Sequence, residues 1–282
     1  MSSAKRSAFI FGGLLVIHLG ALCALAPALF SWPAVITAAL LFYATSALGI
    51  SLTFHRLLTH RSLRVPRFLE YTLALLGTLA LQGGPIDWVS THRKHHAYAD
   101  TADDPHSILP GFIWAHAEWL YRPNPALVPP SQHIRWARDL FEDPFYRFLE
   151  RYELPLQVIL GFTLLAVGGW PFVVWGIFVR LTLVYHCTWL VNSAAHLYGY
   201  QTYRSNDRST NCWWAALLSN GEGWHNNHHA FPFSARHGLA RREIDITWLA
   251  IRTLARLGLA TKIKLPTKEM MERMRLDHKT AA

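Results

Sequence analysis

Long stretches without charge constrain the fold of this chain more than any other feature. Residues 7–55 contain no Asp, Glu, Lys or Arg, and residues 154–179 and 181–203 are also uncharged. Soluble domains rarely leave so much sequence uncharged, whereas a hydrocarbon core about 30 Å thick needs roughly 20 apolar residues for each helix that crosses it. The sequence therefore predicts an integral membrane protein that crosses the bilayer several times.

Proline and glycine divide these stretches into four predicted transmembrane helices. Pro27 and the segment at 31–33 interrupt the first stretch, and a Gly-Gly-Trp-Pro turn at 168–171 interrupts the second. Basic residues at both outer ends of the first hairpin place those ends in the cytoplasm. The predicted spans are residues 8–30, 34–54, 153–169 and 172–197, all approximate.

Histidines gather in three clusters where apolar sequence meets polar sequence. The motifs are HRLLTH at 55–60, HRKHH at 92–96 and HNNHH at 225–229. On a helix, the HxxHH spacing places all three rings of a motif on one face. His55 and His60 would point about 140° apart on an ideal α-helix. We therefore expect this pair to approach a shared site from different directions.

The clusters predict a site for two metal ions. Neutral imidazole is the commonest metal ligand in proteins, and a structural zinc site needs only four ligands. A larger set with open coordination positions suits redox chemistry with dioxygen. Zinc binds nitrogen ligands more tightly than ferrous iron, so purified protein could also carry zinc. The predicted ligands are His55, His60, His92, His95, His96, His196, His225, His228 and His229, with Asn192 acting through a water.

The remaining histidines and several acids are assigned to other roles. The acids near the clusters are expected to orient the imidazoles; they are Asp87, Asp103, Asp104, Asp207 and Glu222. Two histidines, His18 and His186, are expected to pack between helices, and the role of His106 is left open. Solvent exposure is expected for His116, His133, His237 and His278.

The clusters must lie on one side of the membrane to share metals. This condition determines on which side of the membrane the remaining segments lie. The apolar segment 68–82 would be only about 22 Å long as a helix. A crossing there would separate the first two clusters, so we expect an interfacial helix. Residues 83–152 and 198–282 then form a cytoplasmic cap. The predicted fold is a single all-α membrane domain, residues 1–282, with the metal site and both termini cytoplasmic.

The net charge of +9 does not indicate a nucleic-acid partner. Basic residues such as Lys5 and Arg6 flank the apolar stretches, as expected for cytoplasmic loops and for contact with anionic membrane lipids. The three cysteines form no disulfide framework, which agrees with a reducing cytoplasmic side. A metal transporter would carry its ligands within the spans, whereas these clusters gather at one face.

The three motifs resemble the histidine boxes of the membrane fatty-acid desaturases. Their pattern (HxxxxH, HxxHH, HxxHH), order and membrane intervals are typical of that family. The similarity runs over residues 45–262 and is greatest to the Δ9 acyl-lipid and acyl-CoA desaturases of bacteria, cyanobacteria and plants. It is carried by the segments GGPIDWVSTHRKHH, LVNSAAHLYGY and NDRSTNCWWAALLSNGEGWHNNHHAFPFSARHG.

This resemblance implies a cofactor, partners and a reaction. Two iron ions would occupy the nine-histidine site, and a separate ferredoxin or cytochrome b-type protein would supply electrons. The enzyme would insert a cis double bond, at Δ9, into a saturated acyl chain carried on CoA or on a lipid. A hydroxylase or another di-iron oxygenase of the same fold is the alternative. The expected location is a bacterial inner membrane or its equivalent.

The acyl chain would need a shaped tunnel, because neighbouring methylenes are chemically alike. Ala39 and Tyr43, on the second predicted helix above His55, are candidates for its floor, with lipid-facing packing as the alternative. Trp88, just before the second cluster, is a further candidate for substrate binding.

Overall fold

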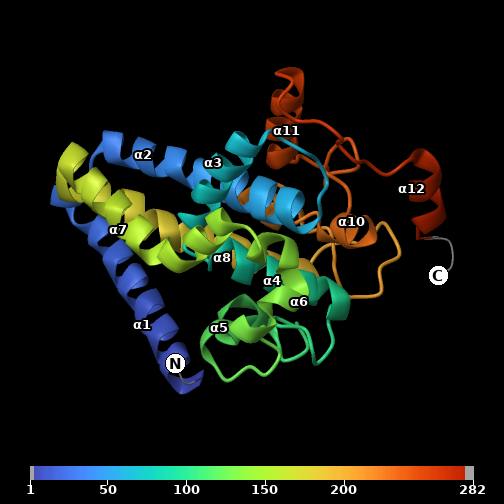
Figure 1. The fold of residues 1–282 in the computed structure, drawn as a ribbon, viewed down its shortest axis with the longest axis horizontal. Coiled ribbons are helices and arrows are strands. Elements are labelled where there is room, and N and C mark those ends of the chain that lie inside the picture. Colours follow the sequence, from blue (N-terminus) through green and yellow to red (C-terminus); the bar gives the residue numbers. More distant parts are fainter. Residues whose placement is uncertain (1–2, 277–282) are drawn as a thin grey trace.

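Residues 3–276 of the computed structural model are described, and this part of the chain is helical, with isolated bridges but no β-strand. The predicted all-α class is therefore confirmed. Figure 1 shows the long helices α1 (Ser3–Leu22), α2 (Trp32–Phe42) and α7 (Pro144–Val173) converging at one end of the molecule. The short helices of the C-terminal region lie at the other end.

Three helical segments are long and apolar enough to cross a membrane: Lys5–Leu25, Trp32–Thr59 and Pro144–His196. The first ends earlier than predicted, because Pro27 begins the second of two short 3-10 turns, Cys23–Leu25 and Pro27–Leu29. The second extends beyond the predicted 34–54, since α2 continues without a break into the π-helix η3 (Tyr43–Thr59).

The third segment folds back on itself. Its 53 residues would extend about 80 Å as a straight helix, far more than a bilayer core. Gly169 has a φ of 68°, which favours glycine, and it breaks the helix where a turn is predicted. Across this turn, a Cβ on Gly176 would lie 2.7 Å from Leu164 Cδ1. The two halves therefore pack as an antiparallel pair, and the second continues through η6 (Val174–Val179), α8 (Arg180–Ser193) and η7 (Ala194–His196).

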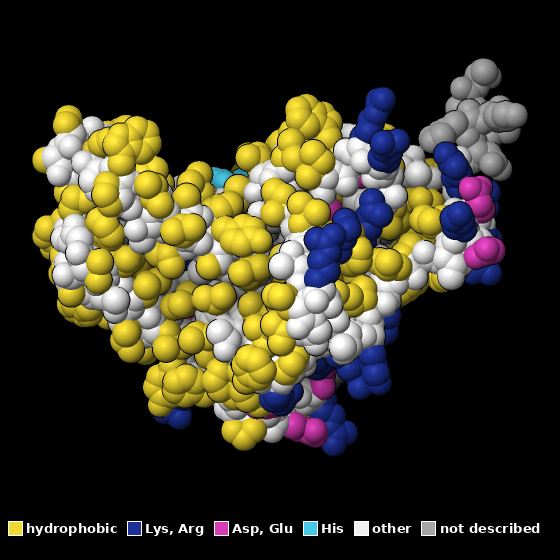
Figure 2. Space-filling view, turned by 90° about the horizontal axis from the view of Figure 1, so that it is seen from above, with side chains coloured by type: hydrophobic (Ala, Val, Ile, Leu, Met, Phe, Trp, Pro, Cys, Tyr) yellow, Lys and Arg dark blue, Asp and Glu magenta, His cyan; other side chains and the backbone are white. Residues whose placement is uncertain are grey.

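The two hairpin turns meet at the end of the molecule away from the histidine motifs (Figure 1). Trp175 Nε1 donates a hydrogen bond to the Leu29 carbonyl over 3.0 Å, which joins them. In Figure 2 hydrophobic side chains cover the half of the face formed by the long helices, and Lys and Arg gather toward the other half. The molecule is thus divided into an apolar part and a charged part.

Helix α3 (Arg67–Thr78) occupies the predicted interfacial segment but ends four residues earlier. It is not among the three candidate spans. Glycines let it approach η3 closely, because a Cβ on Gly49 would lie 2.4 Å from the Gly77 nitrogen. Arg180, buried in α8, donates to the Leu79 carbonyl and to Thr45 Oγ1. These contacts tie α8 to the ends of α3 and η3.

The remaining described helices are α4 (Pro85–Tyr98), η4 (Trp114–Glu118), α5 (Trp119–Tyr121), η5 (Pro130–Gln132), α6 (His133–Phe141), α9 (Trp213–Leu218), α10 (His225–Ala230), α11 (Ile246–Arg256) and α12 (Lys268–Met274). Among them, α4 and α10 carry the second and third histidine motifs. Residues 1–2 and 277–282 lie outside the described residues, and so do the predictions for the extreme termini and for His278.

Candidate metal centre

Four elements bring the nine predicted histidines together: the end of η3, helix α4, the turn η7 and helix α10. Their nitrogens form two groups, and within each group the nitrogens lie within 4.8 Å of one another. The five-histidine group consists of His55, His60, His92, His96 and His228. The four-histidine group consists of His95, His196, His225 and His229.

His55 and His60 come together because η3 winds as a π-helix. The His60 nitrogen donates to the His55 carbonyl over 3.2 Å, and Thr59 Oγ1 reaches the Phe54 carbonyl at 2.7 Å. Both contacts span five residues, as the hydrogen bonds of a π-helix do, so residues i and i+5 lie close to the same face. The two rings have centroids 4.9 Å apart. The separation of about 140° expected from α-helical geometry is therefore wrong, because η3 is not an α-helix.

The start of α4 is held by a carboxylate from α7. Glu150 Oε2 accepts hydrogen bonds from the backbone nitrogens of Ile86 (2.8 Å) and Asp87 (3.2 Å), which otherwise lack helical partners. Pro85 begins the helix with a fixed φ. Only glycine fits before it, since a Cβ on Gly84 would lie 2.3 Å from the Glu150 carboxylate. The HxxHH face of α4 is therefore rigidly placed.

Two asparagines fix α10, whose six residues could not form a stable helix alone. Asn226 Oδ1 accepts from the backbone nitrogens of Thr202 and Tyr203, at 2.8 and 2.9 Å. Asn227 Nδ2 donates to Glu243 Oε2 over 2.8 Å. The asparagines of HNNHH thus hold the helix from its other sides while its histidines face the site. Their burial is not predicted from the motif, whose only hint is two amides between ligands.

The distances within the five-histidine group fit a metal ion. The Nε2 atoms of His55 and His228 are 3.0 Å apart, those of His228 and His96 are 2.9 Å apart, and those of His96 and His92 are 3.1 Å apart. Two metal–nitrogen bonds of about 2.1 Å at a right angle would separate the nitrogens by about 3.0 Å. The Nε2 atom of His60 is buried and has no hydrogen-bond partner among the described residues.

The geometry of the four-histidine group also fits a cation. The Nδ1 atom of His95 lies 3.0 Å from Asp104, and that of His229 lies 2.6 Å from Asp207. A neutral ring that donates from Nδ1 presents a lone pair at Nε2. The two Nε2 atoms face each other at 3.3 Å, where two lone pairs repel unless a positive charge lies between them. The Nε2 atom of His196 is also buried without a partner.

Burial prepares these groups for metal binding. It lowers the pKa of His92, His96 and His228 well below the usual value, so these rings are neutral and can ligate. Burial alone would raise the pKa of Asp104 and Asp207. The neighbouring imidazoles of His95 and His229 outweigh it and hold both pKa values below the usual range. Both aspartates are therefore ionised.

The structure sorts the acids that were expected to orient imidazoles. Asp104, Asp207 and Glu222 contact ring nitrogens of the two groups. Asp87 instead contacts His133, which is buried rather than solvated as predicted. Asp103 is exposed. One orienting acid is not predicted from the sequence: the Asp100 carboxylate lies 3.1 Å from His196 Nδ1. The two residues are far apart in the sequence, so no local pattern indicates that they form a pair.

Glu222 belongs to a buried charge network behind His55. Its Oε2 atom lies 2.5 Å from His55 Nδ1 and 3.1 Å from His237 Nδ1. Arg56 is fully buried and pairs with Glu222 and with Asp245, both at 2.9 Å. The prediction that His237 is solvated is therefore wrong, because the chain after α10 folds back over the metal centre.

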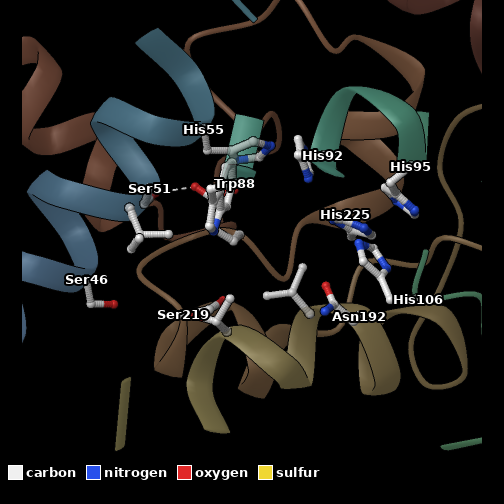
Figure 3. Close-up of a pocket in the computed structure, with 14 residues that line it drawn as sticks. Ser46, Ser51, His55, Trp88, His92, His95, His106, Asn192, Ser219 and His225 are labelled. Carbon is white, nitrogen blue, oxygen red and sulfur yellow. Dashed lines mark hydrogen bonds and ion pairs between the residues drawn. The ribbon is translucent and has the colours of Figure 1, made fainter. Parts of the chain in front are cut away.

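A cavity of about 50 Å³ adjoins both groups. Figure 3 shows His55, Trp88 and His92 along one side of it and Asn192 and Ser219 along the other. Both Trp88 and Asn192 line this cavity together with histidines of the two groups. Its apolar walls include Ile50 and Val191. The predicted tunnel residues Ala39 and Tyr43 are exposed and do not line this cavity.

A second, open hollow of about 330 Å³ reaches other rings of both groups. It shares no lining residue with the cavity, so the two spaces border different parts of the centre. The hollow is lined by His60, Arg93, His96, Asn206, Asp207, His229 and Pro232.

Comparison with known proteins identifies the family of this chain. The model of the family described as fatty acid desaturase matches residues 30–259. The chain belongs to the fatty acid desaturase family. The resemblance carried by the histidine boxes is confirmed, and the desaturase is an oxidoreductase of a membrane-associated family.

Individual relatives cover nearly the whole desaturase. It is 56% identical over 255 residues to an sn-1 stearoyl-lipid 9-desaturase of Anabaena variabilis, covering 90% of this chain and 92% of the relative. A protein of the same name from Synechocystis is 52% identical, with 90% and 79% covered. A chloroplastic palmitoyl-monogalactosyldiacylglycerol delta-7 desaturase of Arabidopsis thaliana is 48% identical, with 94% and 71% covered.

Proposed function

We propose that this chain is a Δ9 acyl-lipid desaturase. The reaction removes one hydrogen from each of two neighbouring methylenes and joins these carbons by a cis double bond. Dioxygen accepts the two hydrogens together with two electrons and two protons, which gives two molecules of water. The proposal follows the names of the 56% and 52% identical relatives. The observation that carries it is the cavity with apolar walls that opens onto both histidine groups.

We propose two iron ions as the cofactor, one in each histidine group, with Asn192 acting on the four-histidine site through a water. Bound iron would supply dioxygen activation and the removal of hydrogen from an unactivated methylene. The support is chemical: nitrogen-only donor sets, nitrogens 2.9–3.3 Å apart, and buried nitrogens without partners. Zinc would fit the same donors, so loading with iron must be verified.

The protein's own contribution is position. Ile50 and Val191 offer an apolar path to the rings, and Trp88 closes one side of it. His55 and His225 line the same space, so a methylene that enters it comes beside both groups at once. Burial of the surrounding side chains excludes water from the site, which protects reactive species from side reactions.

We propose four membrane crossings, with the metal centre on the cytoplasmic side. The third apolar segment folds back at Gly168 and Gly169, and each of its two halves is long enough for one crossing. Lys5–Leu25 and Trp32–Thr59 supply the other two crossings. Both hairpin turns lie together, far from the histidines. Exposed side chains such as Phe162 and Val167 would then face lipid.

A separate protein would deliver electrons through the open hollow. The hollow brings ring edges of His60, His96 and His229 within reach of a docked partner. Exposed Arg204 and Arg208 flank two of its lining residues in the sequence, which favours an acidic partner such as a ferredoxin or a cytochrome b-type protein.

Expression in a bacterial host without membrane desaturases, followed by mass spectrometry with double-bond localisation, tests the function. The expected product is a Δ9 monounsaturated chain at the sn-1 position of membrane lipid. His95→Ala and His228→Ala should abolish the product. His186→Ala, a substitution on α8 outside both groups, should retain it. A hydroxylated product, or full activity in either of the first two variants, would overturn the proposal.

A further inference from the structure

Carboxylates are divided unevenly between the two histidine groups. Three of the four imidazoles in the four-histidine group have an aspartate at Nδ1. The pairs are His95 with Asp104 at 3.0 Å, His196 with Asp100 at 3.1 Å and His229 with Asp207 at 2.6 Å. In the five-histidine group, His55 alone contacts a carboxylate among the described residues, that of Glu222 at 2.5 Å.

The net charge behind the two groups differs as well. No lysine or arginine side chain pairs with Asp100, Asp104 or Asp207 among the described ion pairs, so three full negative charges face the four-histidine group. Glu222 is instead paired with Arg56, which is buried beside it at 2.9 Å and also pairs with Asp245. One positive charge thus faces two negative ones, and a single uncompensated negative charge lies behind the five-histidine group.

The aspartates are fixed in place by contacts of their own. Asp104 accepts from the backbone nitrogens of Asp100 (2.9 Å) and His106 (3.0 Å). Asp100 accepts from the Arg208 nitrogen at 2.6 Å, and Asp207 accepts from the Ser209 nitrogen at 2.9 Å. Each carboxylate is thus held at its imidazole by the loops that follow α4 and η7.

A carboxylate at Nδ1 fixes the tautomer and orientation of a ligating ring and makes it more basic. The loss of such a partner typically lowers metal affinity by 10–100-fold. The four-histidine group has one ligand fewer than the other and two more uncompensated negative charges. Negative charge near a metal ion also stabilises its higher oxidation state, because the Coulomb interaction grows with the charge of the ion.

On this basis we propose that the two metal positions are unequal. Asp100, Asp104 and Asp207 are positioning residues for the four-histidine position alone, and they give its ion the lower reduction potential. When both positions hold iron, the five-histidine position would accept an electron more readily than the four-histidine position, with an external iron–sulfur or haem protein as the source of electrons. This inference rests on the proposed two-metal site.

Metal content tests the first half of the inference without relying on activity. Asp104→Asn and Asp207→Asn keep the size of each side chain and remove its charge. Each variant should bind one ion as tightly as the wild type and a second about 10–100-fold more weakly. After dialysis the ratio should fall from two metals per chain toward one. Asp87→Asn is the matched control, because Asp87 pairs with His133 outside both groups, and it should keep two.

Several outcomes separate the failures. A wild type that binds fewer than two ions overturns the proposed two-metal function. A wild type with two ions, together with Asp104→Asn and Asp207→Asn variants that keep both or lose both with equal affinity, overturns only this inference. Correct folding is checked by the elution of each variant in detergent and by its melting temperature. If a variant misfolds, Asp207→Glu, which keeps the charge, must restore the second ion; failure to do so also overturns the inference.

Redox titration tests the second half. Stepwise reduction of the di-ferric protein, followed by Mössbauer spectroscopy, should show two separate potentials, and the ion reduced first should be unaffected by Asp104→Asn. In that variant the lower potential should move toward the higher one. A single two-electron step in the wild type, or a shift of the higher potential alone, would contradict the assignment.

Discussion

His55 and His60 are five residues apart in the chain, yet their rings meet with centroids 4.9 Å apart. The π-helical winding of η3 produces this contact, because its hydrogen bonds join residues i and i+5. The HxxxxH spacing is therefore the π-helical counterpart of the HxxHH motifs on α4 and α10. Each motif has the spacing that its own helix needs to present rings on one face.

The winding makes a sharp prediction about spacing. In the double substitution Thr59→His with His60→Thr, the two histidines would stand four residues apart, as on an α-helix. The ring of the histidine moved to position 59 should then point away from the five-histidine group. We expect the metal content to fall as far as in His60→Ala. Metal analysis of both variants checks this. Wild-type metal content in the double variant would show that η3 can rewind and that the π-helix is not required.

A second prediction concerns the apolar cavity. Ile50 lines it and is 5% exposed, so Ile50→Trp should fill the space beside the rings. We expect desaturation to fall at least about tenfold with both metals retained, because a displaced methylene no longer reaches a reactive geometry. Ile36→Trp, on the outer face of α2, is the matched control and should stay active. Equal activity in the two variants would show that the acyl chain does not enter this cavity.

The presence of the metal site could be predicted from the sequence, but the division of its histidines into a five-histidine and a four-histidine group could not. His95 and His96 are adjacent and belong to different groups, and so do His228 and His229. Successive residues on an α-helix point 100° apart, so neighbours in one motif reach different points in space. Which point each ring reaches depends on how α4 and α10 face each other, and this is set by distant contacts such as Glu150 and Asn227.

The membrane part was predicted more fully, because apolar length and turn residues are local signals. The all-helical class and the turn near Gly169 needed no tertiary information. Prediction of the substrate path, in contrast, requires tertiary information. Ala39 and Tyr43 lie on the correct helix, but a helix has an outer face as well, and the apolar sequence of a span does not distinguish lipid from tunnel.

A third prediction concerns the donor. Arg204→Glu and Arg208→Glu should each reduce kcat/KM for the electron donor several-fold at low ionic strength, because complementary charge accelerates association. The effect should shrink at high salt, where the Debye length is only a few ångströms. Arg252→Glu on α11 removes the same charge away from the hollow and should leave the rate unchanged. If all three variants respond equally, net charge rather than docking is responsible.

A fourth prediction concerns the buried charge network. Asp245 accepts two hydrogen bonds from Arg56 and caps α11 through the Trp248 nitrogen at 2.9 Å. Asp245→Asn removes one of the two carboxylates that pair with the buried Arg56, and breaking such a buried pair typically costs about 3–5 kcal/mol. Asp139→Asn weakens two partly exposed pairs, with Arg93 and Arg61, and each should cost under about 1 kcal/mol. Melting temperatures in detergent compare the two variants, and equal losses would contradict this role of burial.

Metal removal should destabilise the protein itself, since neighbouring Nε2 atoms in both groups lie only 2.9–3.3 Å apart. Without a cation, the Nε2 atoms of His95 and His229 would repel at 3.3 Å. Each ion present at 100 times its dissociation constant stabilises the folded state by about 2.7 kcal/mol. Chelation should therefore lower the melting temperature. Zinc should restore it without restoring desaturation, because zinc has no redox chemistry. An apoprotein as stable as the loaded enzyme would show that the imidazoles are held apart by the fold alone.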